Sequence, residues 1–162
     1  MPLSDQLLVW LALLAALGCG VIAGVFFAFS TFVMKALARI PHPQGMAAMQ
    51  SINVAVLNPL FLGVFMGTAV ICIAILVLAP MRWQESGAPC LVAGALLYVV
   101  GTVLVTMLFN VPRNNALASL SATDPTSAQR WMSYASSWTA WNHVRTAAAL
   151  AAAVCFCTGL AS

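Results

Sequence analysis

Four stretches of the sequence are almost free of charged residues, and each is long enough to cross a lipid bilayer. The first three contain no charged residue and the fourth contains only Arg145. A transmembrane helix needs about 20 consecutive apolar residues, and helices satisfy their own backbone hydrogen bonds inside a bilayer. We therefore predict an all-α integral membrane protein, a single four-helix bundle domain over residues 1–162, with spans at residues 6–34, 54–80, 88–110 and 138–160.

The composition favours the same class of protein. Only 6% of the residues are charged and 63% are hydrophobic, whereas a soluble domain usually contains about 25% charged residues. The net charge of +3 is small and no cluster of Lys and Arg is present, so we expect the lipid bilayer as a partner and no nucleic acid. The N-terminal MPLSDQ lacks the basic region of a signal peptide, so we expect the first span to be retained.

Two proline-containing signals modify this simple pattern. Asn58 is a good helix N-cap and Pro59 suits the first helical turn, so the preceding QGMAAMQSINVAVL becomes a separate helix or half of a kinked one. Asp124-Pro125 has the character of a helix start. It predicts an additional interfacial helix before the last span.

The loop charges predict the orientation of the bundle. Lys and Arg accumulate in cytoplasmic loops, and here the first and third loops hold most of them, whereas Arg82 on the other side is balanced by Glu85. We expect a bacterial inner membrane protein with loops one and three in the cytoplasm and both termini outside. The cationic loop residues are Lys35, Arg39, Arg113 and Arg130.

Small residues form stripes on the first two spans. Ala16, Gly20, Gly24 and Ala28 recur every four residues, and Gly63 and Gly67 form a GxxxG pattern. Small residues let a second helix approach closely in lipid. The pattern leaves open whether this approach occurs within the chain or between two copies in a homo-oligomer.

Polar side chains gather at one end of the predicted bundle. They come from the start of the second span, the end of the third and the start of the fourth, which an up-and-down topology brings to one membrane face. We predict a ligand pocket there. The set comprises His42, Gln50, Ser51, Asn53, Asn110, Arg113, Asn114, Asn115, Trp138, Asn142, His143 and Arg145.

The stretch WTAWNHVRT, residues 138–146, contributes one wall of this pocket. On a helix Asn142 is central, Trp138 and Arg145 lie within about 60° of it, and His143 and Trp141 lie about 100° away on opposite sides. Structural roles that involve no ligand could also explain these polar and aromatic side chains. Tryptophans anchor helices at membrane interfaces, an Arg can extend to the headgroups, and Asn114 and Asn115 can cap the third helix.

Metal-binding patterns are weak in this chain. The two histidines, His42 and His143, have no carboxylate nearby in the sequence, and a structural zinc site needs four ligands. We expect all five cysteines to be small core or lipid-facing residues. We predict no cofactor, and the alternative is haem or a metal ion held through His143 or His42.

Several stretches resemble one family of small membrane proteins. The matching segments are GVFFAFSTFVMKAL, MAAMQSINVAVLNP, NVPRNNALA and WTAWNHVRTAAALAA. They are spread along the chain from the first span to the fourth and are similar to the four-span anthrone oxygenase-like proteins, a family with fungal members that act in polyketide pathways and with bacterial members.

The resemblance implies an oxygenase that acts on a small lipophilic aromatic substrate with O₂. Removing a proton from the CH₂ of an anthrone gives a stabilised carbanion that reacts with O₂ and yields a quinone without a flavin or metal. We predict His143 as the base, and Arg145 with Asn142 or Asn114 as partners of the oxyanion. The predicted substrate-binding residues are Trp138, Trp141, Asn53, Asn114, Asn115 and Arg113.

Two other functions remain open from the sequence. One is a haem- or metal-dependent membrane oxidase or oxygenase of another substrate. The other is a bundle without enzymatic activity that binds a lipophilic molecule.

Overall fold

The computed structural model describes residues 3–121 and 123–162, and every regular element in these ranges is helical. Four helices are long and apolar enough to cross a membrane: Gln6–Arg39, Pro59–Arg82, Ala88–Ala118 and Ser127–Ala161. The chain is therefore an all-α integral membrane bundle, as predicted. Its elements are α1 (Leu3–Ala28), η1 (Phe29–Val33), α2 (Met34–Arg39), α3 (His42–Ala55), α4 (Pro59–Leu78), η2 (Ala79–Arg82), α5 (Ala88–Leu96), η3 (Leu97–Leu104), η4 (Thr106–Asn110), α6 (Val111–Ala118) and α7 (Ser127–Ala161).

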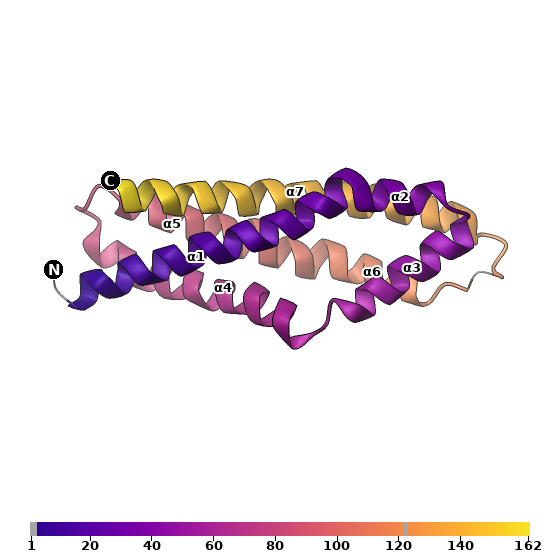
Figure 1. Cartoon of the computed structure of the whole chain (residues 1–162), viewed down its shortest axis with the longest axis horizontal. Helices are drawn as coiled ribbons and strands as arrows, with labels where there is room; N and C mark the ends of the chain where they lie inside the picture. Colours follow the sequence, from indigo (N-terminus) through magenta and orange to yellow (C-terminus); the bar gives the residue numbers. More distant parts are fainter. Residues whose placement is uncertain (1–2, 122) are drawn as a thin grey trace.

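The helices run up and down along one long axis (Figure 1). Helix α7 packs along α1 and against α5. The C-terminus and the start of α1 lie at the same end as the α4–α5 connection, and the α2–α3 and α6–α7 connections lie at the other. We call this second end the loop end, because it holds the two loops with the predicted cytoplasmic charges.

The break at Asn58-Pro59 occurs where the sequence predicts it. The Asn58 side chain accepts a hydrogen bond from the Phe61 backbone N–H at 2.9 Å and donates to the Ala55 carbonyl at 2.9 Å. Pro59 needs no hydrogen-bond partner at the first helical position. The second span therefore begins at Pro59, and α3 is a separate helix that extends toward the loop end (Figure 1).

The segment predicted as an interfacial helix continues without a break into the last span. Asp124 Oδ1 accepts hydrogen bonds from the Thr126 backbone N–H and hydroxyl, both at 2.7 Å. These bonds hold the pKa of the Asp124 carboxyl below its usual range. Helix α7 has 35 residues, and at about 1.5 Å per residue it exceeds the roughly 30 Å hydrocarbon layer. Its first turns therefore lie outside the hydrocarbon.

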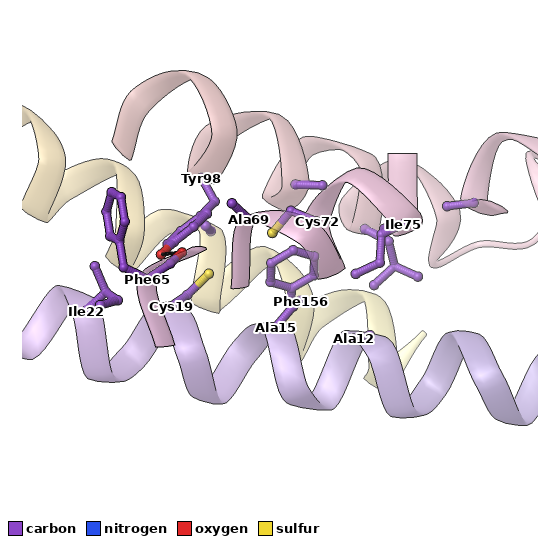
Figure 2. Close-up of a cluster of buried hydrophobic side chains, with 14 of the residues drawn as sticks. Ala12, Ala15, Cys19, Ile22, Phe65, Ala69, Cys72, Ile75, Tyr98 and Phe156 are labelled. Atoms are coloured by element: carbon purple, nitrogen blue, oxygen red, sulfur yellow. Dashed lines mark hydrogen bonds between the residues drawn. The ribbon is translucent and has the colours of Figure 1, made fainter. Parts of the chain in front are cut away.

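Two buried clusters hold the helices together. The larger one joins α1, α4, α5, η3 and α7 through small and aromatic side chains, and Figure 2 shows how Phe156 and Phe65 fill the space between alanines and cysteines. Within it, the Tyr98 hydroxyl donates to the Phe65 carbonyl at 3.0 Å. The second cluster lies at the loop end and consists of Met34, Met46, Met49, Leu117, Trp131, Tyr134 and Trp138.

The glycines of the predicted small-residue stripes do not pack against another helix of the chain. Gly20, Gly24, Gly63 and Gly67 have no neighbouring atom within 4 Å of where a Cβ would stand. Close helix approach occurs at other glycines instead. A Cβ added to Gly101 would lie only 2.5 Å from the Cβ of Ala148 on α7.

We expect Gly101→Ala to destabilise the bundle, because η3 and α7 would have to separate. Overpacking of this kind costs about 1–3 kcal/mol, which corresponds to a fall of roughly 2–4 °C in melting temperature per kcal/mol for a chain of this size. Thermal unfolding in detergent measures the effect, with Gly24→Ala as the matched control. An equal melting temperature for the two variants would contradict this packing.

Candidate functional site

Arg145 lies inside the bundle, near the middle of α7. Its side chain is only 4% exposed. The guanidinium donates through Nη2 to Asn142 Oδ1 at 2.6 Å and through Nη1 to Thr106 Oγ1 at 3.2 Å. Its Nε is buried without a hydrogen-bond partner. Arg145 therefore does not extend to the headgroups but is fixed between α7 and the third span.

Asn142 connects this arginine to helix α1. Its side-chain amide is fully buried and donates to the Phe26 carbonyl and to Ser30 Oγ, both at 2.7 Å. Ser30 Oγ also shares a hydrogen bond of 3.1 Å with Thr146 Oγ1. The amide therefore orients the arginine with its oxygen and holds α1 with its nitrogen.

Two aromatic rings flank the guanidinium. Its central carbon lies 4.1 Å from the centroid of the Phe26 ring and 5.1 Å from that of Trp138. A cation near an aromatic face gains about 0.5–2 kcal/mol, more where water is excluded. The rings offset part of the cost of burying the charge, but they do not neutralise it.

No carboxylate neutralises Arg145 among the described residues. Glu85 is paired with Arg82 at 3.3 Å in the loop at the far end of the bundle, and Asp124 lies in the loop before α7, bonded to Thr126. A buried charge without a counterion costs several kcal/mol. We call Arg145, Asn142, Ser30, Thr106 and Thr146 the arginine centre, a positively charged site with neutral polar neighbours.

Irregular helix geometry surrounds the arginine centre. Ser30 belongs to the π-helical η1, and Thr106 and Asn110 belong to the π-helical η4. Short π-helical segments are frequent at functional sites. Asn110 donates to the Trp138 carbonyl at 3.2 Å, whereas its own Oδ1 and the hydroxyl of Thr102 are buried without a partner. Two of the three buried side-chain atoms without a partner among the described residues are therefore on the third span.

A second hydrogen-bonded group lies between the arginine centre and the loop end. Asn114 Oδ1 accepts from Trp138 Nε1 at 2.8 Å and from the Tyr134 hydroxyl at 3.0 Å. Asn53 Nδ2 donates to the same hydroxyl at 3.5 Å. Asn114 therefore fixes the indole that flanks Arg145, and residues from three helices meet at this point, as the sequence predicts.

The structure does not bring the remaining predicted residues into the arginine centre. His143 is exposed on the outer face of α7, and Asn115 and His42 are exposed as well. Trp141 is stacked on Phe109, with ring centroids 3.6 Å apart. Arg113 lies further toward the loop end, where it donates to Ser137 Oγ at 3.2 Å and to the Phe109 carbonyl.

The sequence reasoning missed several residues of this region. Phe26, Ser30, Thr102, Thr106 and Tyr134 all contribute, and four of them come from apolar spans. One signal was present: Thr102, Thr106 and Asn110 recur every four residues, a spacing that places polar groups on one helix face. Phe26 gave no signal, because phenylalanine is ordinary in a membrane span.

A metal centre has no evident ligand set in the described ranges. No group of three or more His, Cys, Asp or Glu side chains that could hold a metal ion occurs among residues 3–121 and 123–162. The two histidines lie on different elements, His42 at the start of α3 and His143 midway along α7, and both are exposed.

The fold and site together define a class of protein: a small four-span membrane bundle with an unneutralised arginine buried among aromatic rings. The family model for anthrone oxygenase matches residues 61–155, more than half of the chain. The protein therefore belongs to the anthrone oxygenase family. No curated protein and no solved structure matches the chain.

Proposed function

We propose that this protein is a membrane oxygenase that uses O₂ to convert the CH₂ of a flat, electron-rich anthrone-type aromatic into a quinone carbonyl. The observation that carries the proposal is the buried, unneutralised guanidinium of Arg145. A site of this kind favours a ligand that becomes negatively charged. Family membership supplies the chemical class of that ligand.

The arginine centre would act by stabilising the substrate anion. Loss of a proton from the CH₂ moves negative charge onto the oxygen on the opposite side of the central ring. In a site without bulk water, a fixed cation stabilises this charge more strongly than water does, because it does not have to reorient. Arg145 would meet the oxyanion, and Asn142 would hold the guanidinium in place through its 2.6 Å hydrogen bond.

The remaining steps are an oxidation by O₂. The carbanion carbon forms a bond to O₂, and the resulting peroxide takes up a proton. Loss of the second hydrogen of the former CH₂ as a proton, with cleavage of the O–O bond, gives the carbonyl and one molecule of water. The balance is CH₂ plus O₂ to C=O plus H₂O, so O₂ is the only oxidant required and no cofactor enters the proposal.

The bilayer is a suitable source for both reactants, since polycyclic phenols and O₂ partition into lipid. The guanidinium already lies against two flat rings, Phe26 and Trp138. An aromatic substrate would lie beside these rings with its oxygen toward the cation. Asn114 would keep the Trp138 ring oriented through the 2.8 Å bond to its indole N–H.

The acceptor of the CH₂ proton is a separate question, and His143 as that base stays a prediction. His143 and Arg145 are two residues apart on α7, so their side chains leave the helix about 200° apart. If the oxygen of a three-ring substrate lies at Arg145, the CH₂ of the same molecule would not reach the His143 imidazole on the outer face of α7. The proposal therefore rests on Arg145 and Asn142, and the CH₂ proton is the one that the peroxide takes up in the later step.

His143→Ala separates the two mechanisms. We expect the variant to retain turnover within about threefold, because the imidazole lies on the exposed face of α7. A positioned general base contributes typically 10²–10⁴-fold. A loss of that size, with unchanged melting temperature, would make His143 the base and place the substrate on the outer face of α7.

The direct test is oxygen uptake by the purified protein with a model anthrone, together with formation of the quinone. Anthrones oxidise spontaneously in alkaline solution, so mildly acidic buffer keeps the background low. We expect uptake and quinone in equal amounts, from protein whose visible spectrum and metal content show no bound haem or metal. Uptake no faster than with empty detergent micelles, or activity proportional to a bound chromophore, would overturn the proposal.

A further inference from the structure

A cavity outside the arginine centre opens between α6 and α7 at the loop end. Its volume is about 330 Å³. The polar part of its wall is formed by Arg113 on α6 and by Arg130, Ser133 and Ser137 on α7, and the apolar part includes Leu117 and Leu120. Two cations and two leucines in the same lining make this cavity amphipathic.

The two arginines retain unused hydrogen-bond donors. Arg113 uses Nε and Nη1 for Ser137 and the Phe109 carbonyl, which leaves Nη2 free of a partner among the described residues. Arg130 is exposed, and within the described part of the chain its guanidinium forms no hydrogen bond or salt bridge. A guanidinium has five N–H donors and no acceptor, so the cavity is equipped to receive an anion.

No acidic side chain is among the described residues that line this cavity. Asp124 in the preceding loop lies close enough to Arg130 for their charges to interact, but its carboxylate accepts hydrogen bonds from Thr126. The positive charge of the cavity is therefore only partly offset from within the chain.

The depth of the cavity indicates where its ligand comes from. About 20 helical residues cross the hydrocarbon, so a span that begins at Ala88 leaves it near Leu108, and Arg113 follows about one turn later. Counted back from Ala161, α7 leaves the hydrocarbon near Trp141, and Ser137 lies about one turn beyond. Arg113 and Ser137 are therefore at the level of the lipid phosphates, and Arg130, which lines the same cavity, lies further out along α7.

We propose that the cavity between α6 and α7 binds the phosphate headgroup of an anionic phospholipid. Arg113 and Arg130 contact the phosphate, and Ser133 adds a hydroxyl. Basic pockets between membrane helices have the chemistry that recognises such headgroups. The site is independent of the oxygenase proposal, and it would fasten α6 to α7 next to the residues that orient Trp138.

Native mass spectrometry of the detergent-purified protein tests the proposal, with phosphatidylglycerol, phosphatidylcholine and inorganic phosphate added separately. We expect one phosphatidylglycerol to bind in preference to phosphatidylcholine and to raise the melting temperature. Arg113→Gln and Arg130→Gln should each weaken this binding about fivefold or more, the loss of about 1 kcal/mol expected for one basic residue at an anionic surface.

The matched control is Arg39→Gln, which removes the same charge from an exposed position on α2 outside the cavity. It should leave the affinity within about twofold of wild type. If Arg113→Gln does not fold, the phosphatidylglycerol affinity of Arg130→Gln, which changes an exposed residue, still tests the proposal. Equal binding of the two lipids, equal weakening by Arg39→Gln, or the same stabilisation by inorganic phosphate alone would overturn the assignment to a lipid headgroup.

Discussion

Arg145→Met should fold and insert normally but oxidise an anthrone about 100- to 1,000-fold more slowly than the wild type, the loss typical for removal of one oxyanion partner. The fold should persist because methionine fills much of the same volume and removes a charge that is buried without a counterion. The cost that remains is the loss of the donors to Asn142 and Thr106. Oxygen uptake checks the loss of activity, and the melting temperature of the same preparation checks that the fold is retained.

The contrast with Arg39→Met makes this result specific. Arg39 is exposed at the end of α2, so the substitution removes the same charge from the protein without touching the arginine centre. We expect unchanged turnover for this control. If Arg145→Met were as active as Arg39→Met, the buried guanidinium would have no part in the reaction, and the oxyanion would have to be held elsewhere.

Asn142→Ala should have the largest effect on stability. Its side chain makes three buried hydrogen bonds, to the Phe26 carbonyl, to Ser30 and to Arg145. Hydrogen bonds between membrane helices contribute about 0.6 kcal/mol on average and up to about 1.7. The substitution also leaves a buried cation with fewer partners, so we expect a loss of about 2–4 kcal/mol and a fall of roughly 5–15 °C in melting temperature.

The neighbouring residue provides the matched control for this measurement. His143→Ala removes a polar side chain from the same helical turn, but from the exposed face. Its melting temperature should stay within about 2 °C of wild type, a shift below 1 kcal/mol. Equal melting temperatures for the two alanine variants would mean that the contact between Asn142 and α1 does not stabilise the bundle.

Much of the fold follows from the sequence because the bilayer imposes strong and local requirements. Long runs without charge predict the four spans, and the N-cap chemistry of Asn58 with Pro59 predicts the break between α3 and α4. The gathering of Asn53, Asn114 and Trp138 at one end follows from up-and-down topology. The hydrogen bonds of Asn53 and Asn114 with Tyr134, and of Trp138 with Asn114, agree with it.

The orientation of each helix about its axis does not follow from the sequence in the same way. WTAWNHVRT contains two polar residues in succession, Asn142 and His143, and about 100° separates them on the helix. Either could have faced inward. The sequence also does not tell which glycine faces another helix. Gly24 and Gly101 are both compatible with close packing, but of the two only Gly101 meets another helix.

The sequence by itself determined that this chain is a four-span helical membrane protein with a polar loop end, because exclusion of charge from hydrocarbon acts on each segment separately. Only the tertiary structure decided which polar groups meet. Thr106 on η4 and Asn142 on α7 bond Arg145, and Ser30 on η1 bonds Asn142; the contacts from η1 and η4 come from π-helical turns. Those turns shift the faces of their helices relative to regular α-helical spacing, so the meeting point depends on how the spans are packed together.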